Sequence, residues 1–175
     1  MSTVSIRPGV LRDVSYVFAN MRDGDREEVR CQMPETTKTH EIAYWSLMNG
    51  DCWVAYWRDQ PVMTFGVMRL NVAATSAWAI GTKQCWRAIP AVTRFFTLDV
   101  IPSLMERGYV SMEARSIEHH DQAHRWMEAT GARRWGEPYP YGRGGEKFIT
   151  FRWLPDVYNG QRARYQDTTQ EITNG

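Results

Sequence analysis

The sequence predicts an α+β fold of mixed α/β layers, with a central, mostly antiparallel sheet of about six to seven strands flanked by helices. Two periodic stretches support this class. From Lys147 to Trp153, alternate residues share one side of an extended chain, which is the pattern of a β-strand. In a second stretch, residues at helical spacing mark one face that is expected to be buried: Ala123, Trp126, Met127 and Thr130. Because both periods occur along the chain, helices are expected to cover a sheet.

The N-terminal part of the chain is predicted to hold one strand followed by three helices. Val4 to Arg7 is the strand, and apolar residues at helical spacing predict a first helix from Leu11 to Met21. Asp25 and Glu28 have the spacing of a capping box, so a short second helix is expected to begin at Asp25. The third helix is expected from Thr36 to Met48, before an Asn-Gly pair that stops it.

The middle of the chain changes to a strand pattern. Three runs rich in apolar and aromatic residues predict an antiparallel meander: Cys52 to Trp57, Val62 to Leu70 and Thr75 to Gly81. Gly66 lies inside the second run and predicts a bulge or the close approach of another group. A helix is then expected from Ala88 to Arg107. Pro102, which has no N–H to donate, is expected to kink or split that helix.

A strand and a helix follow, and a polar segment ends the chain. The short apolar run from Tyr109 to Met112 predicts the strand, and Ser116 is expected to be the N-cap of the helix. Gly131 can adopt a positive φ and is expected to end that helix. The last stretch has little apolar surface to bury. The sequence therefore predicts a single domain over residues 1–155 and a polar C-terminal tail or arm over residues 156–175.

The composition argues against several classes of function. The net charge is +1, from 21 basic and 20 acidic residues, which disfavours broad binding to nucleic acid or to an anionic membrane. No run reaches the length of a membrane span, and the N-terminus has no apolar signal core. Cys31, Cys52 and Cys85 are widely spaced and predict reduced thiols. Neither a disulfide framework nor a metal site is expected.

The order of these elements resembles the GNAT (N-acetyltransferase-like) superfamily. Three stretches between residues 4 and 153 carry the resemblance: Ile6-Arg7-Pro8 with Asp13, Trp78 to Thr82, and Ala123 to Gly131. The resemblance implies a GNAT-like sheet and, for an active enzyme, acetyl-CoA as the acyl donor.

The resemblance also implies a turn after the fourth strand in which glycines and a helix N-terminus bind the pyrophosphate of acetyl-CoA. In this chain the segment from Thr82 to Pro90 contains no glycine, and Pro90 has no N–H to donate. The candidate cofactor-binding residues are Lys83, Arg87 and Arg94. They either hold phosphates by charge or form a solvated rim.

Few residues are candidates for proton transfer. Where the family's pattern has a Tyr that protonates the departing thiolate, this chain has Met127, and a thioether cannot donate a proton. His120 stands at the family's Asn position; it is either a group that titrates near neutrality or plain surface. Glu113 either deprotonates an amine or simply lies at a sheet edge. His120 and Glu113 are the candidate catalytic residues.

A narrower resemblance is to small GNAT-like proteins of podovirus-type phages, described as internal virion or uncharacterised proteins. It rests on Arg22 to Glu28, Trp78 to Thr82 and Tyr141 to Trp153. Together with the altered phosphate segment, it predicts a non-catalytic GNAT-like phage protein that acts through protein contacts, in virion assembly or in binding a host factor.

This predicted function implies no cofactor. The partners would be phage structural proteins or a host protein, and the protein would lie in the host cytoplasm or be packaged in the virion. The alternative is a CoA-dependent N-acyltransferase with a divergent phosphate-binding loop. In that case the protein is an enzyme and acetyl-CoA is its cofactor.

Overall fold

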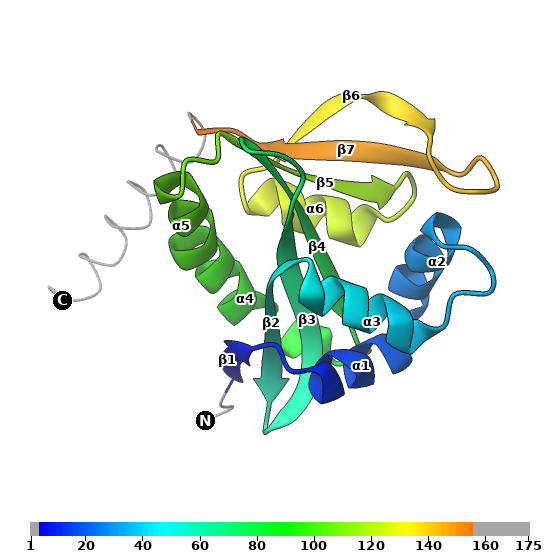
Figure 1. Ribbon diagram of the computed structural model, residues 1–175, viewed down its shortest axis with the longest axis vertical. Coiled ribbons are helices and arrows are strands. Elements are labelled where there is room, and N and C mark those ends of the chain that lie inside the picture. Colours follow the sequence, from blue (N-terminus) through cyan, green and yellow to red (C-terminus); the bar gives the residue numbers. More distant parts are fainter. Residues whose placement is uncertain (1–3, 156–175) are drawn as a thin grey trace, which may run out of the picture.

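The computed structural model describes residues 4–155, which form a seven-stranded sheet with helices on both faces (Figure 1). The strands are β1 (Val4–Pro8), β2 (Gly50–Trp57), β3 (Gln60–Arg69), β4 (Ala74–Gly81), β5 (Ser111–Ile117), β6 (Arg133–Pro140) and β7 (Lys147–Trp153). The α-helices are α1 (Leu11–Ala19), α2 (Asp23–Gln32), α3 (Thr39–Met48), α4 (Ile89–Phe95), α5 (Ile101–Glu106) and α6 (Asp121–Ala129). A 3-10 turn, η1 (Cys85–Arg87), precedes α4. The predicted fold class is confirmed.

The strands lie in the order β1-β2-β3-β4-β5-β7-β6. The predicted meander of β2, β3 and β4 is confirmed, and every neighbouring pair is antiparallel except β4 and β5. The parallel pair joins the two halves of the sheet, and α4, α5 and the turn between them form the crossover from β4 to β5.

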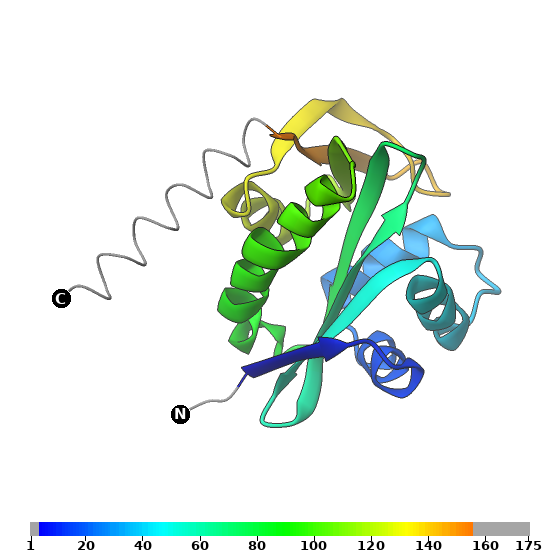
Figure 2. The ribbon, with the colours of Figure 1, turned by 60° about the vertical axis from the view of Figure 1, so that its left-hand side comes forward.

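Two layers of helices cover the two faces of the sheet. Figure 2 shows the blue and cyan helices on one side of the strands and the long green helix on the other. On the first side α1 and α3 bury a core that includes Val14, Val17, Phe18, Val54 and Ile80. On the second side α4, α5 and α6 bury a core that includes Val92, Phe96, Leu104, Met127 and Phe151. Both cores follow from the apolar periodicity of the elements that form them.

The helix predicted from Ala88 to Arg107 is divided, as Pro102 led us to expect. Pro102 lies in the first turn of α5, directly after a π-helical turn, η2 (Phe96–Val100). Because proline has no N–H and its ring crowds the carbonyl one turn earlier, the regular hydrogen-bond ladder cannot continue through it. The chain accommodates this with the wider turn.

Two predicted helix caps are wrong. The N-cap of α2 is Arg22, and neither Asp25 nor Glu28 caps that helix. Ser116 lies buried inside β5, and the N-cap of α6 is His120. In each case the polar side chain that was expected to cap a helix bonds to a distant element instead.

Other local predictions are confirmed. Gly131 has a φ of 95° after the end of α6. A Cβ on Gly66 would lie 2.4 Å from the backbone oxygen of Asp51 and 2.8 Å from the Trp78 ring, so this glycine permits a close approach. Of the face predicted for α6, Met127 is buried, whereas Trp126 is only partly buried.

No helix among residues 4–155 is long and apolar enough to cross a membrane. The three cysteines are free and buried. The predicted tail, residues 156–175, lies outside the described residues, so the tail and the domain boundary before it stay predictions.

Candidate functional site in the gap between β4 and β5

The site begins where the two halves of the sheet separate. β4 and β5 are joined by three residue pairs, the last of which is Ser76 with Glu113. Beyond that pair the strands diverge toward Gly81 and Ile117 (Figure 1). One edge of each strand therefore faces a gap instead of a neighbouring strand.

The backbone of β4 presents hydrogen-bonding groups to this gap. In an antiparallel pair, successive residues direct their N–H and C=O groups alternately toward and away from the partner strand. Thr82 donates its N–H to the Val62 oxygen on the β3 side, at 2.9 Å. Gly81, Ala79 and Ala77 therefore point the other way. The ladder with β5 ends at Ser76, so the main-chain groups of Ala79 face the gap.

A cavity of about 620 Å³ occupies the gap. Its walls come from both faces of the sheet, among them Phe18 and Trp78 on the α1 side, and Phe65 and Trp126 on the α4 side. The strand residues between these walls are small: Ala77, Ala79 and Ala114. The cavity therefore passes through the sheet.

Two carboxylates of α2 hold the far ends of the diverging strands. Asp25 is buried and accepts the N–H of Gly81, at the end of β4, at 2.7 Å. Glu28 lies three residues later, on the same face of the helix, and accepts the N–H of Ile117, at the end of β5, at 3.1 Å. One turn of α2 thus spans the open end of the gap and fixes its width. We call Asp25 and Glu28 the α2 bracket.

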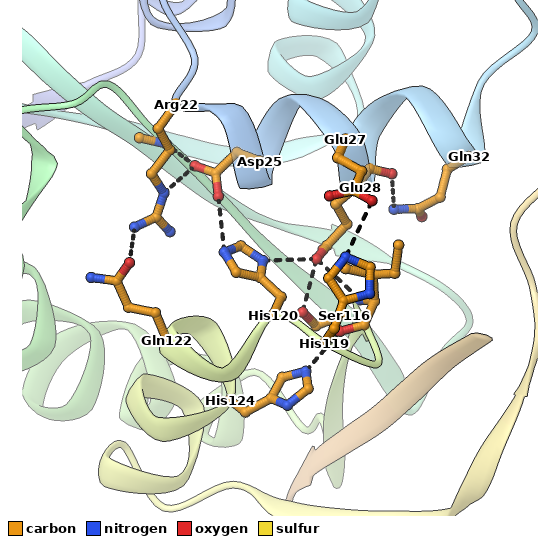
Figure 3. A network of polar contacts seen from close by, with 12 residues as sticks. Arg22, Asp25, Glu27, Glu28, Gln32, Ser116, His119, His120, Gln122 and His124 are labelled. Atoms are coloured by element: carbon orange, nitrogen blue, oxygen red, sulfur yellow. Dashed lines mark hydrogen bonds and ion pairs between the residues drawn. The ribbon is translucent and has the colours of Figure 1, made fainter. Parts of the chain in front are cut away.

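His120 lies between the two carboxylates of the α2 bracket (Figure 3). Its Nδ1 is 3.1 Å from Glu28 Oε2, and its Nε2 is 3.7 Å from Asp25 Oδ1. Because a carboxylate only accepts hydrogen bonds, Nδ1 carries a proton and donates it to Glu28, which in a neutral ring leaves the lone pair on Nε2. The His120 side chain is 13% exposed and lines the cavity. The structure therefore brings this predicted candidate into the site.

Charged and polar neighbours set the electrostatics of the bracket. Burial raises the pKa of the Asp25 carboxyl, and the Arg22 guanidinium together with the Gly81 N–H opposes that rise. The Nε of Arg22 is 3.0 Å from Asp25 Oδ2, and its Nη1 donates to Gln122 Oε1 at 3.0 Å. Burial lowers the pKa of His124, whose Nε2 donates to the Ile117 oxygen at 3.0 Å. Neutral His124 thereby fixes α6 against β5.

Glu113, the second predicted catalytic candidate, does not line the cavity. Its carboxylate forms ion pairs with Arg115 and with Arg152, the latter at 3.4 Å. The cross-strand partner of Glu113 in β7 is Arg152, so this cluster joins neighbouring strands of the sheet.

The predicted phosphate-binding residues Lys83, Arg87 and Arg94 are all exposed, and none of them lines the cavity. The Arg87 guanidinium lies 4.0 Å from the centroid of the Trp57 ring and 4.2 Å from that of Trp86. In these cation–π contacts the positive charge of Arg87 lies against the faces of two aromatic rings. The basic residues that do line the cavity are Arg22, Arg115 and Arg125.

Sequence reasoning missed the α2 bracket and Ser116 as site residues. Asp25 is 56 positions from Gly81 in the chain, and Glu28 is 92 positions from His120. Their local spacing predicted that all three residues cap helices, but in the structure each of them bonds to a distant residue instead. The signal that could have suggested the site was the density of charge between Arg22 and Glu28.

The comparisons with known proteins find no match to the sequence but clear matches to the fold. No protein-family model matches the chain, and neither does any curated protein. Ribosomal-protein-alanine N-acetyltransferase from Brucella melitensis superposes with a TM-score of 0.66 at 12% identity, covering 86% of this chain and 99% of its own. For yncA from Salmonella typhimurium the TM-score is 0.65 at 11% identity, with coverages of 86% and 93%. For AAC(6')-Ib it is 0.67 at 10% identity, with coverages of 90% and 96%.

Two of these structures contain the coenzyme. The yncA structure holds its cofactor acetyl-CoA, and AAC(6')-Ib was solved with ribostamycin and coenzyme A. This finding overturns the prediction that the protein has no cofactor. Nothing in the comparisons supports a phage origin, and the predicted partners and location in a host cell or virion stay predictions. The chain has the GNAT fold, which it shares with N-acetyltransferase structures at low sequence identity.

Proposed function

We propose that the protein is a CoA-dependent N-acyltransferase, which moves an acyl group from a CoA thioester to an amine. The observation that carries the proposal is the gap between β4 and β5, whose cavity of about 620 Å³ passes through the sheet. A donor bound from the α4 side and an acceptor bound from the α1 side would meet there. Solved structures of the same fold hold acetyl-CoA or CoA, which supports this reading.

The gap suits the amide-bearing arm of CoA. Ala79 faces it with an N–H and a C=O group that no β5 residue pairs, and such groups need partners when they are shielded from water. An extended, amide-containing chain can supply those partners in the way an added strand does. The methyl side chains of Ala79 and Ala114 leave the room that the arm requires.

The phosphates of CoA require positive charge at the cavity entrance. Arg125 on α6 is exposed and lines the cavity, and its side chain makes no hydrogen bond or ion pair with any of residues 4–155. Arg22 and Arg115 also line it, but they are already bonded to neighbouring side chains. We therefore assign Arg125 to phosphate binding.

The chemistry needs a group that takes a proton from the attacking amine. The thioester supplies an acyl carbon that an uncharged amine can attack. The Nε2 of His120 would accept the amine proton, and the Glu28 carboxylate at Nδ1 would stabilise the imidazolium that forms. Met127 lines the cavity and cannot donate a proton, so we assign no general acid.

Isothermal titration with CoA and with acetyl-CoA tests the proposal. We expect a dissociation constant at or below about 10 μM, which corresponds to about −7 kcal/mol. Release of free thiol in the presence of amines would show turnover. His120→Gln should lower that turnover by about 10²–10⁴-fold and leave CoA binding nearly unchanged.

Two matched variants, in each of which leucine replaces an alanine, locate the binding site. Ala79→Leu places a branched side chain in the gap and should abolish CoA binding, whereas Ala129→Leu, at an exposed position of α6, should not. Thermal melts of both variants check that they are folded. Absence of CoA binding by the folded wild type at about 1 mM would refute the proposal and favour the predicted non-catalytic protein.

A further inference from the structure

The two oxygens of the Glu28 carboxylate have different surroundings. Its Oε2 accepts three hydrogen bonds, from Ser116 Oγ at 2.8 Å, from the Ile117 N–H at 3.1 Å and from His120 Nδ1 at 3.1 Å. Its Oε1 has no hydrogen-bond partner within the part of the chain that the structure describes. The Glu28 side chain is 18% exposed and lines the cavity. A partly buried carboxylate oxygen without a donor is suited to a cationic ligand.

The walls of the cavity around Glu28 on the α1 side are largely apolar. Along α2 and the segment after it, Val29 and Met33 line the cavity, and α3 contributes Ile42. The indole of Trp78 and the ring of Phe18 form the wall toward the sheet, with their centroids 6.1 Å apart. A ligand on this side therefore meets hydrocarbon and aromatic surface.

The cavity offers one carboxylate oxygen for one positive charge. Among the described residues that line it, the carboxylates are Asp25 and Glu28. The Asp25 side chain is only 3% exposed: its Oδ2 accepts the Gly81 N–H and contacts Arg22, and its Oδ1 faces His120 Nε2 at 3.7 Å, so a second ammonium group has no access to it. An acceptor with several positive charges would leave the others against apolar walls, which is costly.

We propose that the acyl acceptor is a primary amine with a single positive charge on an apolar, aliphatic or aromatic body. This inference rests on the proposed N-acyltransferase function. The ammonium group binds Glu28 Oε1, and the body lies against Met33, Ile42 and Trp78. In this position the amine lies at the carboxylate that also orients His120.

Acceptor turnover at saturating acetyl-CoA tests the inference. We expect 2-phenylethylamine to be acetylated with a kcat/KM at least 10-fold above that of spermidine, which carries several charges, or of glycine, which carries a carboxylate. The binding readout is titration of 2-phenylethylamine into the CoA-bound protein, where no chemistry occurs. Glu28→Gln should weaken this binding at least 10-fold and change the dissociation constant of CoA less than about 2-fold.

Because Glu28 also holds β5, a second variant separates recognition from folding. Met33→Glu adds a carboxylate to the apolar wall and should raise kcat/KM for spermidine at least 10-fold relative to 2-phenylethylamine. Equal use of the three amines by the wild type, or no change of preference in Met33→Glu, would overturn the inference and leave the N-acyltransferase function standing. Failure to bind CoA would refute both.

Discussion

Replacing Asp25 with alanine is expected to destabilise the protein by about 2 kcal/mol. The carboxylate accepts the N–H of Gly81, which is itself buried, and an unsatisfied buried donor costs about 1–3 kcal/mol. Arg22 keeps its bond to Gln122, but its buried Nε loses the contact with Asp25 at 3.0 Å, which adds to the cost. Relief from burying a charged group offsets part of the loss. A change of this size lowers Tm by about 4–8 °C in a chain of this length.

Urea unfolding at pH 7, followed by tryptophan fluorescence, measures the change in the free energy of unfolding. The control is Asp23→Ala, in which the same residue type is removed from an exposed position of α2. Loss of its favourable position near the helix N-terminus should cost below about 1 kcal/mol. If both variants lose the same amount, the buried contact between α2 and the end of β4 does not stabilise the fold, and the α2 bracket is refuted.

Three further predictions concern stability. Because burial raises the pKa of Asp25, the pH-dependent part of its contribution to stability is greatest below the unfolded pKa of about 3.9 and is lost as pH rises through the folded pKa. Asp25→Asn should remove this pH-dependent fall in denaturant titrations across pH. Trp126→Ala should cost about 2–3 kcal/mol, less than for a fully buried ring, because the indole is only partly buried and donates one bond, to Thr93 at 2.9 Å; a loss below about 1 kcal/mol in urea would contradict this. Gly66→Ala should cost at least about 2 kcal/mol because the new methyl meets the Asp51 oxygen, and a Tm equal to that of the wild type would show that β2 and β3 can separate locally.

Elements with a strong period in the sequence were predicted well. The alternation from Lys147 to Trp153 matches β7 at both ends, and the helix that Gly131 ends is present with its buried face. β6 carries no such signal because most of its residues are exposed, and an exposed edge strand needs no apolar alternation. The predicted start of the helix at Ser116 was wrong. A serine hydroxyl can either cap a helix or hydrogen-bond to a distant residue, and the local sequence does not distinguish the two.

The candidate site was predicted only in part. The family's pattern pointed to His120, and the structure places it in the cavity. The same reasoning chose Lys83, Arg87 and Arg94 for their charge and their position after β4, whereas the basic residue that lines the cavity without a bonded partner among residues 4–155 is Arg125 on α6. Proximity in the chain to an expected loop does not reveal which side chains a later helix brings to the same place.

The sequence by itself determined the layers of the fold. Apolar periods of two and of about 3.6 residues fix which side of each strand and helix is buried, and this is a local property of the chain. Only the tertiary structure decided the site. Asp25 and Glu28 form a bracket because Gly81 and Ile117, from separate strands, meet one turn of α2. The width of the gap and the orientation of His120 both depend on hydrogen bonds between distant residues, which no local pattern encodes.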